Sequence, residues 1–265
     1  PVVSLRSTIG LDAARFVMTP EAWFAEVDPK KFFEAIKNHP TWFGQQSTLS
    51  PRRFRLFACA TARQVWDLLS TDACSAVQAS ERYAEGRTTQ ADLLATAVKR
   101  PNTLVTASQI AQAVAQAANS QRGDSSSELR HQLLFDPTDA ARNAARAVAT
   151  RDVGPAPPGR PTTPEWHTAW TAAFASARAI QADYFRDIFP PPRYIPQRDP
   201  HWITSTVVAL ARQMDESGDF STVPILADAL QDAGCEDETL LSCCRTPSKT
   251  HVRGNWVVDL VLERT

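Results

Sequence analysis

Residues 50–69 read SPRRFRLFACATARQVWDLL, and this run indicates a long amphipathic helix. Ser50 offers a side-chain oxygen to the N–H groups of a first helical turn, and Pro51 suits the first helical position, where an N–H has no partner. The side chains that would form one buried stripe recur three or four residues apart, at Phe54, Phe57, Ala58, Thr61, Val65 and Leu68. We therefore expect a helix from Pro51 to about Leu69.

A side-chain acceptor followed by proline recurs along the chain, and each instance predicts a helix start. The five instances are Thr19-Pro20, Asp28-Pro29, Ser50-Pro51, Asp136-Pro137 and Thr163-Pro164. Other patterns predict a helix from Thr71 with Gly86 at its end, two short helices over Ser125 to Thr150, and helices near residues 166–188, 204–214, 222–233, 236–244 and 256–262. No run offers a convincing partner strand, so we expect an all-α, multi-helix bundle.

A proline-rich break divides the predicted helices into two groups. Residues 153–162 read VGPAPPGRPT, which cannot continue a helix and forms a stiff spacer. We expect a helical lobe over residues 18–152, a linker over 153–162 and a second lobe over 163–265, with one bundle and a long surface crossing as the alternative. Met18-Thr19-Pro20 has the form of a natural start, so residues 1–17 are interpreted as an arm or an upstream extension.

The composition is that of an ordinary globular protein, with 43% hydrophobic and 22% charged residues. The formal net charge of −1 argues against a polyanion as the main partner, although a local basic patch remains open. No run of 18 apolar residues predicts a membrane span. Five cysteines without regular spacing, and no visible signal peptide, favour reduced thiols and a cytoplasmic location. No glycine-rich phosphate-binding motif is present.

Three blocks carry a family resemblance. They contain FACA (57–60), RQVW (63–66) and ERYAEG (81–86), then FRDIF (185–189) and DPHW (199–202), then PILADALQDAGC (224–235), CR (244–245) and HVRGNWVVDL (251–260). In this order they resemble a family of uncharacterised proteins that is abundant in planctomycete bacteria, and that carries no established activity. Family members typically have more cysteines after Cys59 and often a cysteine in place of Asn255. A metal site shared by the family would therefore be incomplete here.

Four soft metal ligands lie close together near the C-terminus: Cys235, Cys243, Cys244 and His251. Zinc needs four such ligands in a tetrahedron, usually with one pair two to four residues apart. Adjacent cysteines rarely both reach one ion, and a buried free cysteine is a common small core residue. A zinc- or thiol-dependent enzyme built on this cluster is thus an alternative, while no cofactor, metal ligand or catalytic residue is assigned.

Arginines suggest a second kind of site. The helix predicted from Pro51 carries a row of arginines that could contact phosphates, namely Arg52, Arg55 and Arg63. A second patch could be formed by Arg193, Arg198, Arg245, Lys249 and Arg253. Such a stripe is more often a solvated face or a set of ion-pair partners. A nucleic-acid-associated component of a bacterial defence or mobile-element system is therefore a further alternative.

The run His251-Val252-Arg253-Gly254-Asn255-Trp256 is polar and contains glycine, as functional loops often do. It could equally latch the last helices, with Arg253 bonded to helix-end carbonyls. Because fold signals are strong and catalytic motifs are absent, the leading hypothesis is a non-enzymatic helical interaction module that binds a protein partner. The candidate binding residues are Arg52, Arg55, Arg63, Arg245, His251, Arg253 and Trp256.

Overall fold

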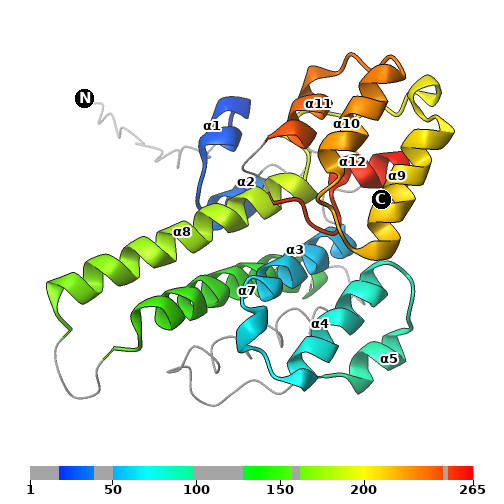
Figure 1. The fold of residues 1–265 in the computed structure, drawn as a ribbon. Helices are drawn as coiled ribbons and strands as arrows, with labels where there is room; N and C mark the ends of the chain where they lie inside the picture. The colour runs from blue at the N-terminus through cyan, green and yellow to red at the C-terminus, as the bar shows by residue number, and fades with distance from the viewer. Residues whose placement is uncertain (1–17, 39–49, 98–127, 157–161, 247–249, 265) are drawn as a thin grey trace, which may run out of the picture.

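The computed structural model describes residues 18–38, 50–97, 128–156, 162–246 and 250–264. Every regular element in these ranges is a helix, which confirms the all-α, multi-helix fold (Figure 1). The elements are α1 (Pro20–Ala25), α2 (Pro29–Asn38), α3 (Pro51–Arg63), η1 (Trp66–Leu68), α4 (Thr71–Ala84), α5 (Gln90–Ala95), α7 (Glu128–Val153), α8 (Pro164–Ile188), η2 (Pro200–Trp202), α9 (Ser205–Ser217), α10 (Val223–Asp232), α11 (Glu238–Arg245) and α12 (Trp256–Val261).

Four of the five acceptor–proline pairs begin a helix, at Pro20, Pro29, Pro51 and Pro164. The Thr19 hydroxyl accepts from the Ala22 N–H at 3.2 Å, and Thr163 accepts from Trp166 at the same distance. The first long helix ends at Arg63 and continues only as the short turn η1, so it is shorter than the pattern predicted.

The Asp136-Pro137 start was wrong. Pro137 lies inside α7, and one helix replaces the two short helices expected over Ser125 to Thr150. An internal proline removes one backbone hydrogen bond and strains the preceding turn. Packing offsets this cost, because the small side chains that follow let α7 lie close against α3 and α8; Ala140, Ala141, Ala144, Ala145, Ala147 and Ala149 are all buried.

The helices enclose three clusters of buried apolar side chains. The first is aromatic and takes Phe32 and Phe54 from one side of residues 153–162 and Phe185 and Phe189 from the other. The rings of Phe32 and Phe185 stack with centroids 4.8 Å apart. A second cluster lies between α3, α4, α7 and α8, and a third lies within α9–α12. The division into lobes over 18–152 and 163–265 stays a prediction, as does the role of residues 1–17, which lie outside the described ranges.

The last four helices form a group of their own around Trp256 (Figure 1). This indole is 2% exposed and meets the Tyr194 ring edge to face at 5.6 Å. Figure 1 shows α9 and α12 lying beside α3 and α4, so residues from the two ends of the chain face each other across a seam. None of the described helices is both long and apolar enough to cross a membrane.

Candidate functional site

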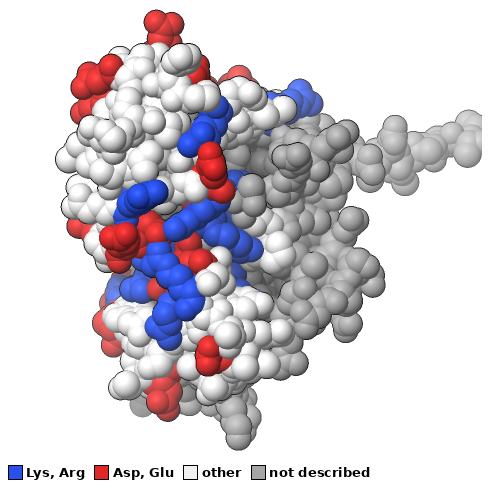
Figure 2. All heavy atoms as spheres, turned by 90° about the vertical axis from the view of Figure 1, so that its right-hand side faces the viewer, with Lys and Arg blue, Asp and Glu red and all other residues white. Residues whose placement is uncertain are grey.

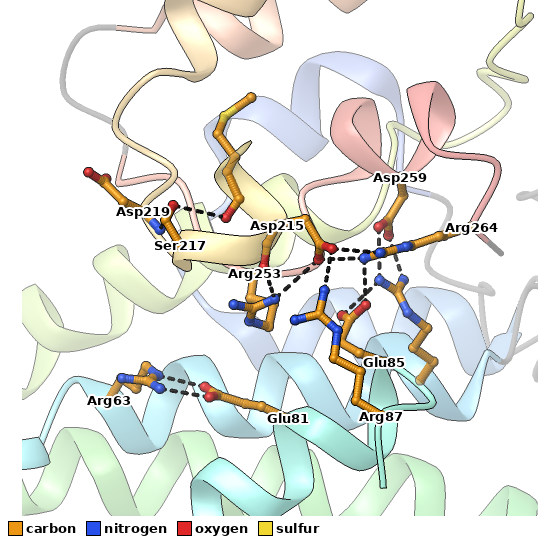
Figure 3. A network of polar contacts seen from close by, with 12 residues as sticks. Arg63, Glu81, Glu85, Arg87, Asp215, Ser217, Asp219, Arg253, Asp259 and Arg264 are labelled. Atoms are coloured by element: carbon orange, nitrogen blue, oxygen red, sulfur yellow. Dashed lines mark hydrogen bonds and ion pairs between the residues drawn. The ribbon is translucent and has the colours of Figure 1, made fainter. Parts of the chain in front are cut away.

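Asp215, in the last turn of α9, lies at the centre of the seam and contacts three arginines (Figure 3). Arg264 approaches its two carboxylate oxygens at 2.5 and 2.6 Å, and Arg87 donates to the same carboxylate. Arg253 donates to the backbone carbonyl of Asp215 at 2.9 Å and to Oδ1 at 3.2 Å. The Asp215 carboxylate is therefore shared among three positive charges.

Two further carboxylates extend this network towards α3. Arg52, in the first turn of α3, grips Asp259 of α12 through two hydrogen bonds of 2.6 and 2.8 Å. Its Nη2 also donates to Glu85 at 3.0 Å, and Glu85 accepts in turn from Arg264 at 2.7 Å. The first long helix, the end of α4 and the C-terminal helix are thus joined by one chain of ion pairs.

Two helix ends place the arginines that reach Asp215. At the end of α4, Gly86 adopts φ +66°, and the Arg87 N–H bonds the Arg82 carbonyl at 2.8 Å, which is a glycine-dependent end of the kind that the sequence predicted. After α12, Glu263 adopts φ +58° without being glycine, and the Arg264 N–H bonds the Asp259 carbonyl at 2.9 Å. Both turns direct the next residue into the seam.

The charges in the network shift one another's protonation. Burial by itself raises the pKa of Asp215, but the hydrogen bond and charge of Arg264 and the charges of Arg87 and Arg253 outweigh it, so the pKa lies below its ordinary value. Burial by itself lowers the pKa of Arg52, but Asp259 and Glu85 outweigh that effect and the net pKa is raised. Both side chains are accordingly held in their charged forms.

A polar groove runs along the seam in three connected hollows. One, of about 360 Å³, lies between Tyr184, Glu81 and Arg253. A second, of about 300 Å³, shares Glu81 and Arg253 with the first and reaches Arg87. The third, of about 630 Å³, shares Arg87 and extends to Arg212 and Arg264. We call this row of three hollows the seam groove.

Arginines outnumber carboxylates along the seam groove. Figure 2 shows positive side chains gathered in the middle of this face and interleaved with negative ones. Among the described residues, the lining includes five carboxylates, Glu81, Glu85, Asp215, Glu216 and Glu263, and seven arginines, Arg63, Arg82, Arg87, Arg198, Arg212, Arg253 and Arg264. Arg82 and Arg212 are exposed, and neither makes an ion pair within the described ranges. The groove is therefore locally positive, although the whole chain carries a net charge of −1.

The structure brings Arg52, Arg63, Arg198 and Arg253 to the seam, whereas Arg55, Arg193 and Arg245 do not line the groove. Arg63 pairs with Glu81 at 2.5 and 2.6 Å and stacks over the Trp66 ring. Arg55 is only 3% exposed and lies over the Tyr83 ring. Arg245 binds Asp228 and Gln231 at the surface of α10, away from the groove lining. Lys249 lies outside the described residues.

The loop before α12 is fastened to α8 through Asp187, whose carboxylate is fully buried. Asp187 accepts from the Val252 N–H at 2.8 Å and from the Asn255 side-chain amide at 2.7 Å, and its Oδ1 lies 2.7 Å from Nδ1 of His251. Asn255 then caps α12 by accepting from the N–H groups of Val257 and Val258. His251 and Trp256 are consequently internal contacts in this structure, and their binding role stays a prediction.

The cysteines of the C-terminal cluster are buried in the core and do not come together as metal ligands within the described ranges. Cys235, Cys243 and Cys244 pack in the core of α9–α12, and the Nε2 of His251 faces the Cys244 carbonyl at 3.1 Å. All five cysteines are free thiols. Burial raises the pKa of Cys59, Cys74 and Cys235, which disfavours the reactive thiolate. Within the described ranges no three His, Cys, Asp or Glu side chains come together as a metal site would require.

Sequence reasoning missed several residues of the seam, namely Glu85, Arg87, Asp187, Asp215, Asp259 and Arg264. Their partners are distant along the chain: Arg52 and Asp259 are 207 residues apart. One signal was available, because Gly86 marks a helix end whose next residue is Arg87. Comparisons with protein-family models, curated proteins and solved structures give no match for this chain. The resemblance to the planctomycete family stays a prediction.

Proposed function

We propose that this protein is a non-enzymatic helical interaction module, located in the cytoplasm, that binds an acidic segment of a protein partner along the seam groove. The observation that carries the proposal is the excess of arginines over carboxylates in a groove bordered by α4, α9 and α12. Guanidinium groups bind carboxylates through paired hydrogen bonds, so an acidic chain supplies the complementary chemistry.

The ion pairs within the groove leave donors for such a partner. The Arg87 side chain makes one hydrogen bond within the described residues, to Asp215, although a guanidinium has five N–H donors. Arg82 and Arg212 make no ion pair with the described residues. The internal pairs hold the groove in shape, and the exposed arginines provide the charge that steers an acidic segment towards it.

The enzyme alternative has less support. Its cysteines are buried in the core, and its histidine is engaged by Asp187 and the Cys244 carbonyl. The nucleic-acid alternative shares the arginines of the groove. It is weaker because the lining, among the described residues, has only two more arginines than carboxylates. Nucleic-acid interfaces carry a much larger excess of positive charge. Free thiols support the cytoplasmic location, since reducing compartments keep cysteines unpaired.

Fluorescence anisotropy with a fluorescein-labelled decaglutamate peptide tests the proposal. We expect saturable binding that weakens with added salt, and about fivefold weaker binding to the double variant Arg82→Ala, Arg212→Ala. The matched control is Arg142→Ala on α7, where the arginine is 56% exposed and pairs, within the described part of the chain, with Asp139 alone. A labelled oligothymidylate of the same length is the competing probe. Binding of the nucleotide but not the peptide would overturn the acidic-segment proposal and favour the nucleic-acid alternative.

A further inference from the structure

The hollow of the seam groove that Tyr184 lines has an apolar wall as well as polar lining. It has a volume of about 360 Å³, within the range of ordinary small-ligand sites. Leu56 and Ala60 of α3, Phe220 after α9 and Val252 before α12 supply this wall. Three segments of the chain therefore build the apolar wall of this hollow, which we call the Tyr184 pocket.

The lining of the Tyr184 pocket also holds hydrogen-bond donors with spare capacity. The hydroxyl group of Tyr184 has no hydrogen-bond partner among the described residues, although the residue is only 8% exposed. Burial raises the pKa of Tyr184, followed by the charge of Asp183, so the phenol keeps its proton and can donate it. The Tyr184 hydroxyl therefore has a free donor that it can offer to a group bound in the hollow.

Arg253 brings positive charge to the same pocket. Its Nη1 binds Asp215, and its guanidinium lies over the Phe220 ring at 5.7 Å, while Nε and Nη2 have no acceptor among the described residues. Asp215 is shared with Arg87 and Arg264 and therefore does not neutralise Arg253 alone. Arg63 and Glu81, which also line the pocket, form a two-bond pair that cancels their own charges. The pocket consequently carries a surplus positive charge beside an apolar wall.

We propose that the Tyr184 pocket binds a carboxylate carried by a compact apolar group. The carboxylate accepts hydrogen bonds from Tyr184 and Arg253, and the apolar group packs against Leu56, Ala60 and Phe220. This ligand chemistry has two sources, a free organic acid or the C-terminal apolar residue of a peptide. The inference goes beyond the acidic segment proposed for the seam groove, because it depends on an apolar wall that decaglutamate does not need.

Isothermal titration calorimetry with 3-phenylpropionate tests the proposal on the full chain. We expect saturable one-to-one binding, and at least about tenfold weaker binding of the uncharged analogue 3-phenylpropan-1-ol, because a hydrogen bond to a charged group is lost. The peptide Ac-Ala-Ala-Ala-Phe with a free C-terminus distinguishes the two sources. Binding of the peptide as tightly as the free acid assigns the pocket to chain ends, and binding of the free acid alone assigns it to small molecules.

Two variants locate the binding. Tyr184→Phe removes only the unpaired hydroxyl and should weaken 3-phenylpropionate binding about tenfold without loss of stability. Its matched control is Tyr194→Phe, whose hydroxyl binds Asp237 in the other half of the molecule. Ala60→Leu fills the pocket and should abolish binding. Failure of both acids to bind, equal affinity for the alcohol, or full affinity in Tyr184→Phe would each overturn the proposal.

Discussion

The buried carboxylate of Asp187, in the last turn of α8, lies 2.7 Å from Nδ1 of His251, and this contact fastens the loop that leads into α12. The same carboxylate accepts from the Val252 N–H and from the Asn255 amide, and Asn255 caps α12. One side chain on α8 therefore determines where the last helix begins. Because α12 carries Asp259, which Arg52 grips, the loop also positions part of the seam.

Replacing Asp187 with alanine should destabilise the protein strongly. The change leaves the donors of His251, Val252 and Asn255 buried without their acceptor, which we expect to cost about 3 kcal/mol or more in the free energy of unfolding. Urea denaturation followed by circular dichroism measures this cost. The control is Asp228→Ala, whose carboxylate is 67% exposed and pairs with Arg245 at the surface, and which should cost less than about 1 kcal/mol. Equal effects of the two variants would contradict the role given to Asp187.

Stability should fall in acid as Asp215 takes up a proton. The pKa of Asp215 is lower in the folded protein than its ordinary value of 3.8, so its contribution is present in full above that value and is lost as the pH falls through the lowered folded pKa. We expect the free energy of unfolding of Asp215→Asn to change less between about pH 5 and pH 3 than that of the unmodified chain. Urea denaturation across this range measures the difference. Parallel curves for both proteins would show that Asp215 does not contribute.

Local chemistry explains why the helix starts were predictable. At Thr19, Thr163 and Gly86 the deciding interactions lie within one helical turn, so the sequence displays them directly. The start at Pro137 failed because tertiary packing of the following alanines overrides a local signal. Packing between distant segments of the chain cannot be predicted from a pattern of neighbouring residues.

The candidate site was only half visible in the sequence. Arg52, Arg63 and Arg253 were noticed because arginines stand out on an amphipathic helix and in a glycine-containing loop. Their carboxylate partners were not, since Arg52 meets Asp259 across 207 residues and Arg87 meets Asp215 across 128. Only the fold pairs these charges. Only the fold shows that the groove arginines without an ion pair in the described ranges are other residues, Arg82 and Arg212.

Glycine at position 263 should stabilise the protein. Glu263 adopts φ +58°, a left-handed conformation that costs a non-glycine residue about 1 kcal/mol. Glu263→Gly relieves this cost and gives up only an exposed ion pair with Arg198, so we expect a net gain of about 0.5 kcal/mol in the free energy of unfolding. Glu263→Ala is the control, because it loses the ion pair and keeps a side chain at the left-handed position. A glycine variant no more stable than the alanine variant would show that the turn is not strained.

The thiols should react slowly in the native protein. Burial raises the pKa of Cys59, Cys74 and Cys235, and Cys243 and Cys244 are buried as well, which leaves half-buried Cys74 as the most accessible sulfur. With iodoacetamide near neutral pH, mass spectrometry should find at most one label on the native chain, at Cys74, and labels on all five cysteines in guanidinium chloride. The variant Cys74→Ser should take up none while folded. Rapid labelling of Cys235, Cys243 or Cys244 in the native chain would contradict the buried arrangement and would revive the thiol-enzyme alternative, because a thiolate must be accessible to act as a nucleophile.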